Sequence, residues 1–310
     1  MAKGLSLHVG VNKLGQRYFD AGWREPLKGC VNDAQSMYEI AKSQGFGAPP
    51  GFRQDKPIPN LLLDDEATIE SVKNGIEAAK GSFADSSGEK GYFLLTFAGH
   101  GSYCKDTNGD EADGEDETWC LWDNELIDDE LYGLLAEFRS GVRILVIADC
   151  CYSAPELGGP FFAALVKKTR VTARKLLAAV GLVGGERVLP TEVSKNLQKQ
   201  DANYCMQVQK NYPSGKKVEM KAAVLYLAAC KENETAEDAK DGSANGVFTA
   251  ALKSVWKGGS LTNYKNFYEE IKKGVTNGQH PQLVPFGAAY PDPGAADPDF
   301  EHAVPPFTII

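Results

Sequence analysis

The sequence predicts an α/β fold in three layers, with helices on both faces of a mainly parallel sheet of about six strands. Short, almost wholly apolar segments recur along the chain, and amphipathic helical segments separate most of them. This alternation is typical of parallel strands that are joined by helices and buried on both faces. The 310 residues, 43% of them hydrophobic, are sufficient for one large domain.

Six segments are predicted as strands because each is short, apolar and bounded by polar or turn-forming residues. They are residues 5–11, 60–63, 91–97, 142–148, 222–229 and 281–286.

Five segments are predicted as helices. We expect Asn32 to cap a helix over 32–43, and Thr68 to cap one in which apolar residues recur every three or four positions. The other three are expected at about 128–138, 244–257 and 262–275.

The pattern divides the chain into three parts. Residues 1–154 form a large catalytic unit, residues 155–221 read as an irregular linker or insert, and residues 222–310 form a smaller unit that completes the same domain. Because the chain starts directly at its first strand, we expect no N-terminal prodomain.

Composition excludes several classes of protein. No run approaches eighteen apolar residues, and the start lacks the features of a signal peptide, so we expect a cytoplasmic protein with no membrane partner. The seven cysteines show no paired spacing and are expected to be reduced. We expect no organic cofactor.

The negative charge is concentrated in one segment. Residues 105–130 hold twelve acidic residues and one lysine, a net of −11, so the total of −9 leaves the rest of the chain at about +2. This distribution argues against a nucleic-acid partner.

Reactive residues follow two of the predicted strands. His100 comes after 91–97, and Cys151 comes after 142–148. The carboxyl ends of parallel strands meet at one edge of a sheet, where an imidazole can activate a thiol and then protonate a leaving amine. The amides of Gly101 and Cys151 are expected to form an oxyanion hole. A lone cysteine is usually a small core residue, but its pairing with a histidine favours catalysis.

The segments around His100 and Cys151 resemble the catalytic signatures of the metacaspases, which are relatives of the caspases. They are residues 97–101 (FAGHG) and 149–153 (DCCYS). Further segments resemble metacaspase motifs in the same order, at residues 27–34, 63–68, 113–117, 127–130, 229–231 with Thr235, and 281–283. The resemblance implies a caspase-like three-layer sandwich and a cysteine peptidase. It also selects Cys151, rather than its neighbour Cys150, as the nucleophile.

The resemblance implies cleavage after Arg or Lys, and the residues agree with this implication. Asp33 and Asp149 lie next to apolar elements, where two carboxylates would bind a guanidinium or ammonium group. Asp33 has an alternative role as a helix-capping residue. The resemblance adds Cys30 and Ala98 to the substrate pocket, although the family has serine at position 98.

The acidic segment has two interpretations. The resemblance implies an activating Ca²⁺ site with Asp116, Asp128 and Asp129 as ligands, and the alternative is a solvated acidic surface loop. An EF-hand is rejected because Glu111 stands where that loop needs glycine.

A basic run at residues 167–175 also has two interpretations. It lacks the interleaved aromatic residues of a nucleic-acid patch, and for a peptidase that cuts after basic residues it reads as a self-cleavage segment. The alternative is a solvated helix face. The candidate residues are Lys168, Arg170, Arg174 and Lys175.

The sequence therefore predicts a cysteine endopeptidase that cleaves proteins or peptides after Arg or Lys through Cys151 and His100. Calcium, the insert or a regulatory protein partner is expected to control it. The alternatives are a catalytically silent caspase-like scaffold or signalling module, and a different Arg-specific peptidase of the same clan.

Overall fold

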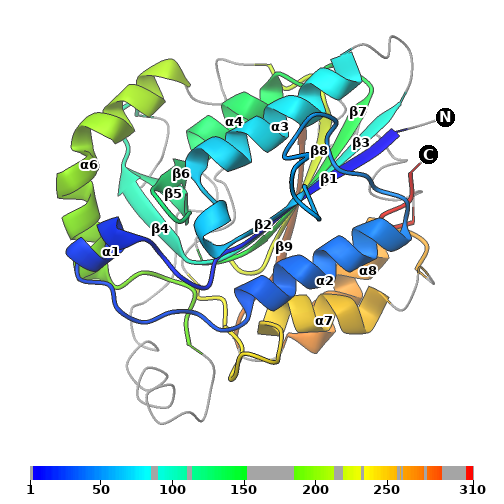
Figure 1. The fold of residues 1–310 in the computed structure, drawn as a ribbon. Coiled ribbons are helices and arrows are strands. Elements are labelled where there is room, and N and C mark those ends of the chain that lie inside the picture. Colours follow the sequence, from blue (N-terminus) through cyan, green and yellow to red (C-terminus); the bar gives the residue numbers. More distant parts are fainter. Residues whose placement is uncertain are drawn as a thin grey trace.

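Six strands form the central sheet of the computed structural model, in the order β2-β1-β3-β7-β8-β9 (Figure 1). All neighbouring strands are parallel except β8 and β9, which are antiparallel. The strands are β1 (Lys3–Gly10), β2 (Leu61–Leu63), β3 (Gly91–Ala98), β7 (Val142–Asp149), β8 (Ala223–Ala228) and β9 (Gln282–Gly287). The predicted fold class is confirmed, and β8 and β9 lie beside β7 in the same sheet.

The structure describes residues 3–84, 90–109, 114–151, 185–212, 219–231, 234–256, 259, 261–275, 278–287 and 305–309.

Helices cover both faces of the sheet (Figure 1). One face carries α2 (Cys30–Ser43), α7 (Val247–Trp256) and α8 (Tyr264–Gly274), and the other carries α3 (Ile69–Ala84) and α4 (Asp128–Ala136).

The side chains of the central strands alternate between two hydrophobic cores, as they must in a strand buried on both faces. In β7, Ile144 and Val146 belong to the core that includes the apolar residues of α3 and α4. Leu145 and Ile147 belong to the core beneath α2, α7 and α8.

A small antiparallel sheet follows directly on His100. It consists of β4 (Gly101–Lys105), β5 (Glu115–Cys120) and β6 (Glu125–Ile127). The acidic segment therefore contains two strands and the start of α4, and Glu117 and Glu125 in these strands are buried. A wholly solvated acidic loop was therefore the wrong interpretation. The sequence does not reveal these strands because the apolar residues that anchor β5 and β6 are few and lie between carboxylates.

A long helix, α6 (Thr191–Asn211), occupies part of the segment that the sequence predicts as irregular. The prediction fails there because most of this helix is polar, and only a few residues, among them Val193, Leu197 and Val208, are apolar and buried. Two short elements complete the described chain, α1 (Gln16–Asp20) and the 3₁₀ turn η1 (Asp64–Glu66).

The predicted helix starts differ in accuracy. Thr68 does cap α3, since its hydroxyl accepts a hydrogen bond from the Ser71 amide at 3.1 Å. Asn32 does not cap α2, which begins at Cys30 with Gly29 as its N-cap. Its side chain instead donates to the carbonyl of Gly242 at 2.8 Å, across the fold.

All seven cysteines are free thiols and are buried. Within the described ranges, no helix has both the length and the apolar character needed to cross a bilayer.

A buried histidine in β1 makes the fold sensitive to acid. His8 is fully buried, its Nδ1 lies 2.9 Å from the Thr96 hydroxyl, and burial lowers its pKa to about 3. The folded state therefore holds His8 neutral while the unfolded chain gains a proton below pH 6.5, so stability falls as the pH decreases from 6.5 towards 3.

We expect His8→Asn to reduce this acid sensitivity. Between pH 7 and pH 5, the wild type should lose about 2 kcal/mol of unfolding free energy through His8 alone. The variant, whatever its stability at pH 7, should show a drop smaller by that amount in urea unfolding at the two pH values. Equal drops would contradict the assignment.

Candidate active site

The predicted dyad lies at the ends of two adjacent strands. In the register of β3 and β7, Ala98 stands opposite Asp149, and His100 and Cys151 each follow two residues later. Because neighbouring strands are about 4.8 Å apart, the imidazole and the thiol start from the same edge of the sheet. Gly101 then begins β4, so the histidine sits at the junction of the two sheets.

The thiol of Cys151 is enclosed. Its side chain is fully buried, and Sγ accepts a hydrogen bond from the Ala236 amide at 3.0 Å. Burial raises the pKa of Cys151 well above its usual value, and a hydrogen bond with the neighbouring Cys230 thiol acts in the same direction, while the Ala236 amide opposes them. In this arrangement Cys151 is a protonated thiol.

The imidazole of His100 is also enclosed. It meets the ring of Trp23 edge to face, with 4.7 Å between the ring centres. Neither ring nitrogen has a hydrogen-bond partner among the residues that the structure describes. Burial lowers the pKa of His100 to about 3, against the opposing effect of Asp238. The two reactive groups are therefore both neutral, and the thiol is hydrogen-bonded to Ala236 and Cys230 rather than to the imidazole.

The two predicted oxyanion-hole amides converge on one oxygen atom. The amides of Gly101 and Cys151 donate to the carbonyl oxygen of Arg187, at 2.9 Å and 3.2 Å. A Cβ atom at position 101 would lie 1.9 Å from the carbonyl oxygen of Cys151, so only glycine fits there without a backbone shift. Two amides aimed at one carbonyl oxygen are the arrangement that stabilises a tetrahedral intermediate in acyl transfer.

The guanidinium of the same Arg187 lies among three carboxylates. It is fully buried and forms ion pairs with Asp33, with Asp149 at 2.8 Å and with Asp238 at 3.0 Å. Burial alone would lower the pKa of Arg187, but the surrounding acidic groups, Asp149 foremost, raise it well above its usual value. Asp33 and Asp149, predicted to hold a basic side chain, thus hold one that belongs to the chain itself.

Hydrogen bonds from elements far apart in sequence hold the side chains of Asp33 and Asp149 in place. Asp33, in the first turn of α2, accepts hydrogen bonds from the Asn245 side chain at 2.8 Å and the Gly246 amide at 3.1 Å. Asp149, at the end of β7, accepts from the Thr249 hydroxyl at 2.7 Å at the start of α7. Burial, with Asp149 adding to it, raises the pKa of Asp33 to about 6, although Arg187 acts to lower it.

Asp238 is the third carboxylate, and the sequence analysis missed it. Its side chain accepts hydrogen bonds from the amides of Lys28 at 2.6 Å and Gly29 at 3.0 Å, and it ion-pairs with Arg187. One signal was available. Asp238 lies shortly after β8, which neighbours β7, so the topology brings it to the same edge as Cys151.

Cys30 and Ala98, the other predicted pocket residues, lie beside the carboxylates. Together with Leu27 they form a small buried apolar cluster. Burial raises the pKa of the Cys30 thiol well above its usual value, and the nearby Arg187 acts against that shift. Both side chains are therefore neutral, so the charge of the pocket comes from its aspartates.

Residues 185–189 cross the dyad as an extended peptide. On one side, the Arg187 amide donates to the carbonyl of Ala236 at 2.9 Å, and the Asp238 amide donates to the carbonyl of Gly185 at 2.8 Å. On the other side, the Leu189 amide donates to the carbonyl of Gly101 at 3.2 Å. The segment is thus paired on both sides like an added strand, which is a common mode of peptide recognition.

Two of the predicted calcium ligands, Asp116 and Asp129, are hydrogen-bonded to side-chain amides. The Gln209 amide donates to Asp116 at 2.6 Å, and the Asn108 amide donates to Asp129 at 2.6 Å, so carboxylate oxygens of both are engaged by amides. Asp128 begins α4. Across the described ranges, no three or more His, Cys, Asp or Glu residues gather so as to hold a metal ion.

The predicted self-cleavage residues Lys168, Arg170, Arg174 and Lys175 lie outside the described residues.

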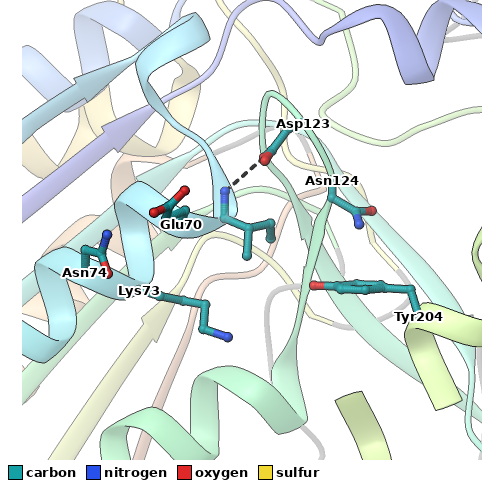
Figure 2. Close-up of a pocket in the computed structure, with 7 residues that line it drawn as sticks. Glu70, Lys73, Asn74, Asp123, Asn124 and Tyr204 are labelled. Atoms are coloured by element: carbon teal, nitrogen blue, oxygen red, sulfur yellow. Dashed lines mark hydrogen bonds between the residues drawn. The ribbon is translucent and has the colours of Figure 1, made fainter. Parts of the chain in front are cut away.

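A hollow of about 420 Å³, lined mostly by polar residues, lies at the start of α3, facing α6 (Figure 2). Asp123 closes one side of it by accepting a hydrogen bond from the Ile69 amide at 2.9 Å, and Lys73 and Tyr204 face each other across it. None of its lining residues is a predicted site residue.

A thiol and an imidazole at adjacent strand ends, beside two amides that share a carbonyl oxygen, define an acyl-transfer site of the cysteine peptidase kind. The comparisons agree. The family model described as the caspase domain matches residues 10–286, which is most of the chain. The chain belongs to this caspase-domain family of cysteine endopeptidases, and its substrates are proteins or peptides.

Individual relatives support the same family. Metacaspase-1 of Schizosaccharomyces pombe is 25% identical over 304 residues, which are 93% of this chain and 68% of that protein. Metacaspase-3 of Arabidopsis thaliana is 33% identical over 159 residues, which are 49% of this chain and 40% of that protein. The crystal structure of a protein from Geobacter sulfurreducens superposes with a TM-score of 0.72 at 31% identity, covering 99% of both chains.

Proposed function

We propose that this peptidase cleaves proteins after arginine or lysine. One observation carries the proposal: Arg187 places its guanidinium among three carboxylates while its carbonyl oxygen accepts from the amides beside the nucleophile. A substrate residue before the scissile bond must satisfy the same two conditions at once, one with its side chain and one with its carbonyl group.

Electrostatics favours a basic residue in this pocket and excludes an acidic one. Three buried carboxylates that lose their partner repel one another, and an incoming cation removes that repulsion. Arginine should be preferred to lysine, since its planar guanidinium can pair with several carboxylates at once. A substrate aspartate would add a fourth negative charge.

The chemistry requires Cys151 and His100 to meet. The Cys151 thiol transfers its proton to His100, and the thiolate attacks the substrate carbonyl carbon, whose oxygen is held by the amides of Gly101 and Cys151. His100 then protonates the leaving amine, and water, activated by His100, releases the acid product. The enclosed arrangement must first open, because burial opposes the charged forms of both groups.

The proposal is tested with fluorogenic peptides that differ only in the residue before the scissile bond: arginine, lysine or aspartate. Hydrolysis after arginine and lysine, with a higher kcat/KM for arginine, is expected. Hydrolysis after aspartate alone would overturn the specificity. No hydrolysis by chain from which the 185–187 segment has been released would favour the silent scaffold.

Asp238 should contribute more to the cleavage of arginine peptides than to the cleavage of lysine peptides. It pairs with Nη2 of Arg187 at 3.0 Å. We expect Asp238→Asn to lower kcat/KM for an arginine peptide by about 10-fold to 100-fold, the range for a charge-assisted hydrogen bond. The lysine peptide should lose less, because an ammonium group cannot reach all three carboxylates at once. Equal losses for both peptides would contradict this role.

Calcium activation, processing at residues 167–175 and control by a protein partner remain predictions. Calcium is tested by measuring peptide hydrolysis in Ca²⁺ and in a chelator, with Asp129→Asn as the variant. Equal rates in the two buffers would contradict calcium activation.

A further inference from the structure

We propose that the Arg187–Val188 peptide bond is a self-cleavage site of this chain, and that the uncut segment blocks the active site. The inference rests on the proposed function, because the bond follows the arginine that fills the specificity pocket. It differs from the sequence prediction, which placed self-cleavage at residues 168–175.

Three separate contacts put this bond where a substrate bond belongs. The Arg187 side chain is in the carboxylate pocket, and its carbonyl oxygen accepts from the amides of Gly101 and Cys151. The backbone on both sides is paired, since Glu186 forms an antiparallel bridge with Glu237 and Val188 forms a parallel bridge with Gly101. A buried structural arginine needs only the first of these contacts.

The cleavage step follows the proposed mechanism. The Cys151 thiolate attacks the carbonyl carbon of Arg187, and the oxyanion forms between the two amides. The C–N bond to Val188 breaks, and the new amine takes its proton from His100. Water then hydrolyses the thioester, which leaves a carboxylate on Arg187 and restores the thiol.

The enclosed state explains why the bond can persist until a trigger acts. The Cys151 thiol is protonated and hydrogen-bonded to Ala236, and the His100 imidazole is neutral. Neither group can begin the attack until the site opens enough for the proton to pass between them. The chain therefore holds its own substrate in place and uncut.

Cleavage would allow the pocket to be freed because it separates Arg187 from the segment that is anchored in the core. Leu189 is buried in the core, and Pro190 is the N-cap of α6, so the new amino terminus at Val188 remains attached. On the other side, Gly185 and Glu186 pair through their backbone with Asp238 and Glu237, and the Arg187 side chain forms its ion pairs. After the cut, Arg187 can withdraw and a substrate arginine can take its place.

The test is a time course of the full chain, with and without Ca²⁺, followed by intact mass measurement and N-terminal sequencing. The expected products are residues 1–187 and 188–310, with a new terminus that reads Val-Leu-Pro. The Cys151→Ala variant should stay intact, because it has no nucleophile. Arg187→Gln should slow cleavage at this bond by at least about 100-fold, because a pocket built for a charged group rejects a neutral one. Arg174→Gln is the matched control and should be cut at the wild-type rate.

A second variant guards against misfolding, since Arg187→Gln leaves buried carboxylates without a cation. Arg187→Lys keeps the charge and should still be cut between positions 187 and 188, more slowly than wild type. First cleavage within residues 168–175 with the 187–188 bond intact would overturn the assignment. If an added arginine peptide is hydrolysed while this bond stays intact, the inference fails and the proposed function stands. If chain that has been cut between 187 and 188 does not hydrolyse peptides ending in arginine or lysine, the proposed function itself fails.

Discussion

Replacing Cys151 with alanine is expected to lower kcat/KM for an arginine peptide by at least about 10³-fold, since the variant has no nucleophile. Cys150→Ala is the matched control. The two neighbouring side chains belong to opposite cores, Cys150 to that of α3 and α4 and Cys151 to that of α2, α7 and α8. Cys151 lies against Ala236 and the Arg187 carbonyl.

Steady-state hydrolysis measures this effect, with thermal unfolding of both variants to show that they fold. Cys150→Ala should keep activity within about tenfold of wild type, because it removes a buried sulfur without touching the site. Activity that survives in Cys151→Ala but is lost in Cys150→Ala would show that the nucleophile was assigned to the wrong cysteine.

Replacing Arg187 with methionine should have the largest effect on stability. The variant leaves Asp33, Asp149 and Asp238 buried without a cation, and breaking a buried ion pair in this way costs about 3–5 kcal/mol. Burial already raises the pKa of Asp33 to about 6 while Arg187 acts to lower it, so removal of the guanidinium should raise that pKa further.

The pH dependence identifies the cause of this loss. With a raised pKa, folded Asp33 keeps a proton that the unfolded chain has released above pH 4, so stability falls as the pH rises through the folded pKa. Urea unfolding should therefore show a large deficit for Arg187→Met at pH 7.5 and a smaller one at pH 5.5. Arg24→Met, at an exposed arginine, is the control and should change stability by less than about 1 kcal/mol. A deficit independent of pH would mean that lost packing, not charge, is responsible.

The fold could be predicted because its information is local. Each central strand, such as 142–148, is an almost wholly apolar run, and its burial on both faces follows from that pattern. The positions of His100 and Cys151 followed in turn, because residues placed just after parallel strands must reach the same edge.

The substrate pocket could be predicted only in part, because much of it is assembled from distant segments. Asp149 could be predicted from its position beside the nucleophile. Arg187 carries no local signal and Asp238 has only its place after a predicted strand, and their pairing depends on how residues 185–189 lie between β4 and the chain after β8. The denser basic run at 167–175 attracted the self-cleavage prediction, whereas the single Arg187 fits the pocket.

The most direct test of the central claim is labelling with two irreversible probes. Each carries a chloromethyl ketone on a short peptide, one ending in arginine and the other in aspartate, and is applied to the chain after release of the 185–187 segment. Mass spectrometry of peptides should find one adduct, on Cys151, with the arginine probe only. Labelling by the aspartate probe, or an arginine adduct on Cys150 or Cys230 in place of Cys151, would contradict the account.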